Sequence, residues 1–332
     1  MPISLNRLMK FRAILLLFLC IGFYLIVRLV TRYYSQNYRN SSIDFLKITN
    51  PNVNIIDPDG PSLNRNFTCI ETREMFNLYH TNLCLHSKTD TISNVVGVNR
   101  VWEEDDLKRV LFVLMKNPDM DMIDIGANIG GFTMFTAGAL GRFTLAIDCY
   151  LPNIERIARA VQMRNVQNRV VLVQNAIYPV SGKSLTIRIN DDPSGVNLFD
   201  DQANNLPKRE YVVKTLRFDD VLPILIARNV KTAMIKIDIE AAESFMCESG
   251  SKIFEEINIP YIMMEWHGIR SKYQERYQFI IDFFSARGYV ATDQSCKDLR
   301  IKDWLRNWPG NVFWLKRNYP RQLLCANAKQ PQ

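Results

Sequence analysis

Asp121–Thr136 reads D-M-I-D-I-G-A-N-I-G-G-F-T-M-F-T, and this stretch decides the fold. Met122–Ile125 is a short apolar run typical of a buried parallel strand, and Phe132–Leu140 has apolar residues at helical spacing. The glycines between the two segments predict a tight turn from strand to helix. Glycine lets the backbone come close to a ligand, and the free amide groups that begin a helix can bind an anionic group. The turn therefore indicates a cofactor site.

The spacing of the turn narrows the choice of cofactor. A dinucleotide site reads G-x-G-x-x-G, whereas Ala127 and Asn128 give D-x-G-x-x-x-G-G here. We therefore expect a nucleoside cofactor without a pyrophosphate, of which S-adenosylmethionine is the common one. A glycine-rich turn that binds no ligand is the alternative interpretation of this segment.

Around this turn, strand-like and helix-like segments alternate in a regular order. The predicted strands are Met122–Ile125, Phe143–Ile147, Val170–Val173, Ala233–Ile237, Tyr261–Met264, Tyr289–Thr292 and Val312–Leu315. The predicted helices are Leu107–Met115, Phe132–Leu140, Ile154–Arg164 and Tyr273–Ala286, with further extended segments at Leu185–Ile189 and Tyr211–Thr215. This order predicts an α/β fold with a doubly wound, mostly parallel, seven-stranded sheet. Ligands of such a fold bind at the carboxyl ends of the strands.

Charged side chains fall at these predicted carboxyl ends. Asp148 ends the second strand, where a carboxylate can accept hydrogen bonds from both hydroxyls of a ribose; a helix-capping role is the alternative. Lys236, Asp238 and Glu240 alternate with isoleucines, so on a strand all three would point the same way. Three charges on one face are costly in a core. They indicate either that the residues line a cleft or that they pair with one another on an exposed edge strand.

Four sequence features together resemble one protein family. They are D-I-G-A-N-I-G-G at 124–131, T-L-R-F-D-D-V-L at 215–222, I-K-I-D-I-E-A-A-E at 235–243, and the late Glu265. On these residues the chain, from about Trp102 to Leu315, resembles the FkbM-type family of S-adenosylmethionine-dependent methyltransferases. The resemblance implies a class I methyltransferase fold and the methylation of a hydroxyl group, often on a sugar or another oxygen-rich natural product.

The resemblance also implies roles for single residues. The predicted cofactor residues are Asp124, Gly126, Asn128, Gly130, Asp148 and Asn175. The first four of these would contact the methionine part of the cofactor, and Asp148 its ribose. The chain departs from the family pattern at two positions, because Asp148 stands where a glutamate is usual and Ala241 where the glycine of an E-G-x-E motif is usual.

Methyl transfer to an alcohol needs a group that removes the hydroxyl proton, because an alcohol is a poor nucleophile at neutral pH. The predicted catalytic residues are Lys236, Asp238, Glu240, Glu265 and His267. Asp238 is the preferred base, because its strand is expected beside the one that carries Asp124, and His267 is the alternative. Carboxylates that share a cleft raise one another's pKa, and Lys236 would temper this effect by pairing. No metal is required.

The N-terminal part of the chain has the pattern of a membrane-anchored protein. Ala13–Val30 is apolar and close to membrane-spanning length if Arg28 reaches back to the interface. No small-x-small cleavage site follows it, which favours a retained signal anchor over a cleaved signal peptide. We expect a cytosolic tail at 1–12, an anchor at 13–31, a lumenal stem at 32–66 and a methyltransferase domain at 67–332. The short span favours the Golgi or the endoplasmic reticulum.

Sequons and cysteines support a lumenal address. Asn40 and Asn66 begin acceptor tripeptides, and six cysteines follow the anchor. The predicted disulfides are Cys69–Cys84 and Cys296–Cys325, and the remaining thiols are Cys149 and Cys247. A metal site from Cys69, His80, Cys84 and His86 matches no common zinc spacing.

The composition is that of an ordinary folded chain, with 47% hydrophobic and 23% charged residues. The net charge of +7 comes without a basic block, so we expect no nucleic acid as a partner. The expected partners are a glycan or another hydroxyl-bearing substrate, and the membrane through the N-terminal helix. The alternative is a membrane-anchored binding protein that keeps the nucleotide-binding fold without catalysis. A glycosyltransferase would share the anchor and stem, but D-I-G-A-N-I-G-G is not expected there.

Overall fold

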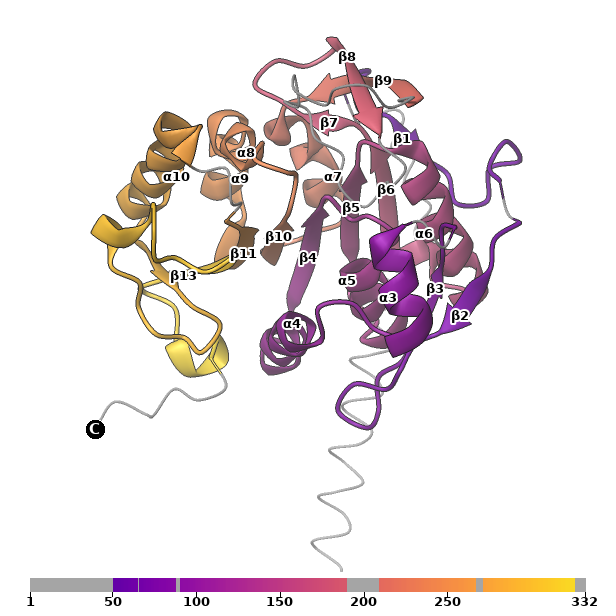
Figure 1. Cartoon of the computed structure of the whole chain (residues 1–332), viewed down its shortest axis with the longest axis horizontal. Helices are drawn as coiled ribbons and strands as arrows, with labels where there is room; N and C mark the ends of the chain where they lie inside the picture. Colours follow the sequence, from indigo (N-terminus) through magenta and orange to yellow (C-terminus); the bar gives the residue numbers. More distant parts are fainter. Residues whose placement is uncertain (1–49, 65, 88–89, 190–208, 267–270, 326–332) are drawn as a thin grey trace, which may run out of the picture. The chain divides into compact units, whose positions relative to one another are not determined.

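The computed structural model describes residues 50–64, 66–87, 90–189, 209–266 and 271–325. Its main feature is a sheet in the strand order β1-β6-β5-β4-β10-β11-β13-β12 (Figure 1). The strands are β1 (Ile55–Ile56), β4 (Met120–Ile125), β5 (Thr144–Asp148), β6 (Val170–Gln174), β10 (Thr232–Ile237), β11 (Asn258–Glu265), β12 (Tyr289–Thr292) and β13 (Asn311–Lys316). The five strands from β6 to β11 run parallel, and β13 is antiparallel to both neighbours. The seven predicted strands are therefore confirmed as one mostly parallel sheet.

An eighth strand comes from the segment that the sequence assigned to a stem. Residues Ile55 and Ile56 of β1 pair antiparallel with Val173 and Leu172 of β6. The folded part of the chain thus includes residues that precede position 67.

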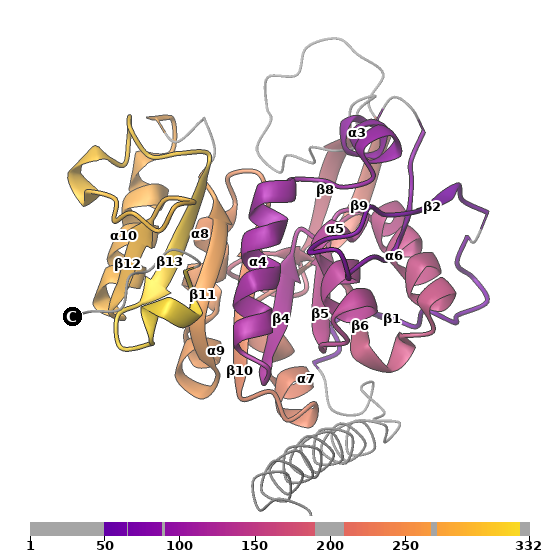
Figure 2. The ribbon, with the colours of Figure 1, turned by 90° about the horizontal axis from the view of Figure 1, so that it is seen from below.

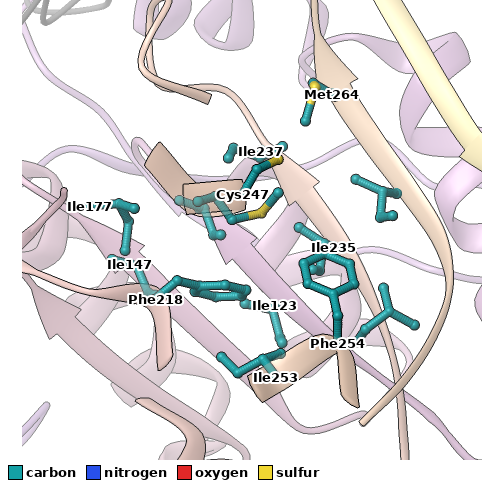
Figure 3. Close-up of a cluster of buried hydrophobic side chains, with 14 of the residues drawn as sticks. Ile123, Ile147, Ile177, Phe218, Ile235, Ile237, Cys247, Ile253, Phe254 and Met264 are labelled. Atoms are coloured by element: carbon teal, nitrogen blue, oxygen red, sulfur yellow. The ribbon is translucent and has the colours of Figure 1, made fainter. Parts of the chain in front are cut away.

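Helices cover both faces of the sheet (Figures 1 and 2). One face packs on α4 (Glu104–Lys116), α5 (Gly131–Met134) and α6 (Leu151–Arg164), and the other on α7 (Leu222–Ala227), α8 (Glu243–Ser249), α9 (Ser251–Glu256) and α10 (Gln274–Ala286). Ile235 and Ile237 of β10 lie in the core beside α8 and α9 (Figure 3). Met234 packs into the opposite core with α4. Because strand side chains alternate, Lys236 lies on the α4 side.

The helix expected at Phe132–Leu140 is divided in two. It begins as the four-residue α5 and continues as a π-helical turn, Phe135–Ala139. A Cβ on Gly138 of this turn would lie 2.6 Å from Oγ1 of Thr81, so the turn packs tightly against the chain before β3. Wide turns of this kind are frequent near functional sites.

Several elements were not predicted as such, among them the helices α7, α8 and α9. The hairpin of β2 (Cys69–Glu71) and β3 (Asn82–Cys84) and the helix α3 (Thr91–Asn99) precede the main sheet. A small sheet joins β7 (Ala176–Ile177), β9 (Arg209–Leu216) and β8 (Ser184–Ile189), and it contains both predicted extended segments.

Both predicted disulfides are present. Cys69–Cys84 joins β2 to β3, and Cys296–Cys325 ties the chain after β12 to the C-terminal segment. Cys149 and Cys247 are free thiols, as expected.

Among the residues that the structure describes, no helix is both long and apolar enough to cross a membrane. The predicted anchor at 13–31 and the sequon at Asn40 lie outside the described residues.

Candidate active site

A cleft opens at the carboxyl ends of β4, β5 and β10. It encloses about 890 Å³ of space, a volume that includes open solvent at its mouth. The predicted residues that line it are Gly126, Asn128, Asp148, Asn175, Lys236, Asp238 and Glu240. Asp124 and Gly130 are not among the described residues that form its wall.

The turn after β4 brings two strand ends into contact. The N–H of Asp238 donates to the carbonyl oxygen of Ile125 over 3.0 Å. Gly126 has φ +76°, and a Cβ built there would lie 1.8 Å from the carbonyl oxygen of Asp238. Only a glycine permits this approach of the two backbones. Asn128 also has a left-handed backbone, with φ +51°, and it completes the turn at the floor of the cleft.

Asp148 is held rigidly at the end of β5. Its Oδ2 accepts from the N–H of Asn128 over 2.8 Å and its Oδ1 accepts from the N–H of Tyr150 over 2.8 Å. The side chain of Asn153 donates to both oxygens over 3.3 Å. Burial raises the pKa of Asp148 to about 6, against the effect of these hydrogen bonds. A carboxylate has about four lone-pair sites, and these contacts occupy about as many, so a further contact with ribose hydroxyls stays a prediction.

Asn175 has a structural role as well as a place in the cleft wall. Its Oδ1 accepts from the N–H of Asn54 over 2.8 Å, and its Nδ2 donates to the carbonyl oxygens of Asn52 and Lys214 over 3.0 Å. The side chain therefore joins the segment before β1 to β9. Contact between Asn175 and the cofactor stays a prediction.

Asp124 and Lys236 lie side by side on adjacent strands, as register partners in β4 and β10. Asp124 is fully buried, and Thr133 donates to its Oδ2 over 2.6 Å. Lys236 donates to the carbonyl oxygen of Gly126 over 2.9 Å and to Oδ2 of Asp238 over 3.4 Å. Burial acts to lower the pKa of Lys236, but the carboxylates of Asp238 and Asp124 outweigh it and raise the pKa. Lys236 is therefore a fixed cation beneath the turn.

Three of the predicted catalytic residues form one cluster. Carboxylate oxygens of Asp238, Glu240 and Glu265 all lie within 4.8 Å of one another. Burial, and then the charges of Asp238 and Glu240, raise the pKa of Glu265 to about 10. Burial and Asp238 raise the pKa of Glu240 to about 7. The predicted effect of shared carboxylates on their pKa values is therefore present.

The same spacing could also suit a divalent cation bound by oxygen ligands. The expectation that the reaction needs no metal stays a prediction. His267, the alternative base, lies outside the described residues.

Glu240 reaches this cluster by a route that differs from the predicted strand alternation. Strand β10 ends at Ile237, and Glu240 and Ala241 follow in a left-handed turn with φ +56° and +69°. The family's usual glycine at position 241 is thereby explained, because glycine adopts this conformation without the steric cost that alanine has.

Replacing Ala241 with glycine tests this account. Glycine removes the steric cost of the left-handed backbone, about 1–2 kcal/mol. This gain in stability should offset the loss from a more flexible unfolded chain and from the missing burial of a methyl group. We expect the free energy of unfolding of Ala241→Gly to change by less than about 1 kcal/mol. Ala242→Gly is the matched control, because Ala242 is fully buried with φ −101°. Ala242→Gly should lower the free energy of unfolding by about 1–2 kcal/mol more than Ala241→Gly does. Equal losses for the two variants in denaturant unfolding would contradict the left-handed turn at position 241.

Glu243, the last residue of the I-K-I-D-I-E-A-A-E segment, stabilises that turn. Its Oε1 accepts from the N–H of Ile239 over 3.0 Å, and the residue is 1% exposed. Burial raises its pKa to about 8. Glu243 therefore positions the loop and does not face the cleft.

Sequence reasoning missed Glu103. This residue precedes α4 with φ +43° and ψ +52°, and its neighbour Trp102 lines the cleft. Burial raises the pKa of Glu103 to about 7, Lys236 lowers it, and Asp238 raises it. No periodic pattern marks such a residue, because it lies in a loop and approaches the cleft only through the tertiary structure.

A family match covers about half of the chain and most of the residues that line the cleft. Residues 124–291 match the Methyltransferase FkbM domain. The chain is a member of the FkbM methyltransferase family. Its cofactor is S-adenosylmethionine, as the sequence predicted. The chain has no match among curated proteins.

Two solved structures show a distantly similar course of the chain. A putative caffeoyl-CoA O-methyltransferase from Staphylococcus aureus is 13% identical to this chain, with a TM-score of 0.38. The similarity covers 70% of this chain and 93% of the other chain. TYW2 from M. jannaschii, in complex with AdoMet, is 11% identical to this chain, with a TM-score of 0.35. The similarity covers 76% of this chain and 86% of TYW2. These likenesses are distant, and the assignment of this methyltransferase rests on the family match.

The residues present fit S-adenosylmethionine. The floor of the cleft at Gly126 is free of a side chain, which lets a ligand approach the backbone, and the carboxylate of Asp148 lies in the cleft wall at the end of β5. The carboxylate cluster of Asp238, Glu240 and Glu265 lies at the edge of this cleft, beside Lys236.

Proposed function

We propose that this methyltransferase transfers the methyl group of S-adenosylmethionine to a hydroxyl group, and that the acceptor is a glycan of the secretory pathway. The observation that carries the proposal is the carboxylate cluster, two members of which line the cofactor cleft. A hydroxyl acceptor needs a base within hydrogen-bond reach of its proton, and a carboxylate at this edge meets the requirement.

The chain's own residues act on the acceptor. When bound, S-adenosylmethionine would supply an electrophilic methyl group to the acceptor oxygen and would leave as S-adenosylhomocysteine. Asp238 accepts the hydroxyl proton, and its carboxylate is oriented by Lys236 at 3.4 Å. Glu265, whose pKa is raised to about 10, is protonated at neutral pH, and its side-chain hydrogen bond with Asp238 helps to orient that carboxylate.

A lumenal address is supported by two disulfides and by the exposed Asn66 in its sequon. If the chain enters the secretory pathway, glycosidase treatment should lower its apparent mass. The double variant Asn40→Gln, Asn66→Gln should abolish that shift. An unglycosylated protein found in the cytosol would contradict this part of the proposal.

The test of function uses the purified protein, S-adenosylmethionine with a labelled methyl group, and a panel of glycans. We expect label in a glycan and one equivalent of S-adenosylhomocysteine for each methyl transferred. Label in a lipid or a protein side chain would refute the glycan. Tight cofactor binding in calorimetry with no transfer to any acceptor would favour a binding protein that lacks catalysis.

A further inference from the structure

Asn153 supports the carboxylate of Asp148 from the first turn of α6. Side chains of a helix tilt toward its N-terminus, so Asn153 points back to the end of β5. Its Nδ2 donates to both carboxylate oxygens of Asp148 over 3.3 Å. Asn153 is 2% exposed and lines the cofactor cleft beside Asp148, so its amide is part of the cleft wall.

His86 contacts two of the residues that hold Asp148. Its Nε2 lies 2.7 Å from Oδ1 of Asn153, a contact between residues that are 67 positions apart in the sequence. Its ring stacks on that of Tyr150, with centroids 6.0 Å apart and planes at 16°. The N–H of Tyr150 in turn donates to Oδ1 of Asp148. The backbone N–H of His86 donates to Oγ of Ser93 in α3 over 2.9 Å, so the segment that carries the ring is tied to that helix.

The chemistry of the three side chains fixes the direction of each hydrogen bond. An ionised carboxylate only accepts, so Asn153 turns its NH₂ group toward Asp148 and its carbonyl oxygen toward His86. A carbonyl oxygen also only accepts, so Nε2 of His86 carries a proton. The three residues therefore form one series of donors that runs from His86 through Asn153 to Asp148.

The donor on His86 decides which way the amide of Asn153 faces. An amide has two orientations that differ by a half-turn and have nearly the same shape. Without the donor, each orientation leaves either the oxygen or the NH₂ group of Asn153 without its present partner, and an unpaired buried polar group is costly. Asp148 then loses a fixed donor, and its carboxylate is free to turn.

We propose that His86 is a positioning residue for the ribose of S-adenosylmethionine, because it holds the amide of Asn153 with its donors toward Asp148. The inference rests on the ribose contact that the sequence predicts for Asp148, and it does not depend on the acceptor. The contacts from Asn153, at 3.3 Å, are longer than the 2.8 Å contacts from backbone N–H groups. Ribose hydroxyls can therefore share the same carboxylate oxygens with Asn153.

The experiment measures by calorimetry how tightly variants of the whole protein bind S-adenosylmethionine. Phenylalanine at position 86 keeps a ring against Tyr150 but has no donor, whereas glutamine has a donor. We expect Kd to rise about tenfold in His86→Phe and to stay within about threefold of the wild type in His86→Gln. His80→Phe is the matched control and should bind like the wild type. Nε2 of His80 lies 3.0 Å from Glu71, and His80 is not among the described residues that line the cleft.

The pH dependence of binding distinguishes positioning from a packing defect. Burial raises the pKa of Asp148 to about 6, and the hydrogen bond from Asn153 is one of those that act to lower it. Only the ionised carboxylate is free to accept from a ribose with both oxygens, so binding should weaken as the pH falls through this pKa. In His86→Phe the pKa of Asp148 should rise further, so binding should begin to weaken at a higher pH than in His86→Gln. Neither variant has a titrating ring at position 86. The charged groups that face Asp148 and position 86 are the same in both variants: Lys236, Arg156 and Asp90.

Asn153→Ala removes the middle of the series while His86 stays in place. It should raise Kd at least as much as His86→Phe does. Combining the two changes should add little, because both act through one contact.

Four results would overturn the inference. They are an unchanged Kd in His86→Phe, an equal loss in His86→Gln, losses that add in the double variant, and identical pH profiles for the two variants at position 86. Asp148→Asn tests the ribose contact by itself. Wild-type affinity in Asp148→Asn refutes that contact and the inference with it, whereas a loss there with normal binding in His86→Phe refutes the role of His86 alone.

Discussion

Gly126→Ala is expected to abolish the binding of S-adenosylmethionine. The new Cβ would lie 1.8 Å from the carbonyl oxygen of Asp238, which is backbone and cannot rotate away. The left-handed φ of +76° adds about 1–2 kcal/mol for any residue with a side chain. The ends of β4 and β10 must separate, so both the cleft floor and the position of Asp238 change. We expect no binding in calorimetry and a loss of at least about 3 kcal/mol in the free energy of unfolding.

Gly310→Ala is the control for this variant. A Cβ on Gly310 would meet no heavy atom of the described residues within 4 Å, and Gly310 is not one of the residues that line the cleft. Its affinity for S-adenosylmethionine should stay within about tenfold of the wild type. Wild-type affinity in Gly126→Ala would show that the two strand ends do not meet as described.

Asp238→Asn should retain S-adenosylmethionine but lose turnover by about two to four orders of magnitude. Asparagine keeps the shape of the side chain and can still accept a hydrogen bond from Lys236, but it cannot take a proton from a hydroxyl at neutral pH. Calorimetry and the labelled-methyl assay measure the two properties separately.

Glu240→Gln and Glu265→Gln distinguish the members of the carboxylate cluster. We expect each to retain more activity than Asp238→Asn, because Asp238 is the member that Lys236 orients. If Asp238→Asn turns over normally while Glu240→Gln or Glu265→Gln is inactive, the base is that residue. If all three are active and His267→Ala is inactive, the base lies outside the cluster.

The sequence predicted the sheet because its strands are short apolar runs separated by a glycine turn or by segments whose apolar residues have helical spacing. It also predicted that Lys236 points away from Ile235 and Ile237, since alternation along a strand is a local property. It could not predict that Lys236 lies beside Asp124, because the register between β4 and β10 depends on packing across the whole sheet.

Two positions show where local reasoning ended. Glu240 was expected to continue the alternation of β10, but the strand ends at Ile237 and a left-handed turn places the residue instead. Glu103 lies far along the chain from the other acidic residues of the site, and only the docking of α4 brings it there. For the helix α3 the sequence did contain a local signal, an aspartate at the N-cap position. Asp90 caps the helix by accepting a hydrogen bond from the N–H of Ser93 over 2.6 Å.

The wall formed by α3 and Trp102 affects how far the protein can be shortened. The family match begins at residue 124, and every strand from β4 onward lies after α4. Yet Ile92 and Trp102 line the cofactor cleft, and His86 is hydrogen-bonded over 2.7 Å to Asn153, which donates to Asp148. A polypeptide trimmed to the matched segment would lose Met120–Ile123 of β4 and the whole of β13 from its sheet, and it would also expose the ribose end of the cleft to bulk water.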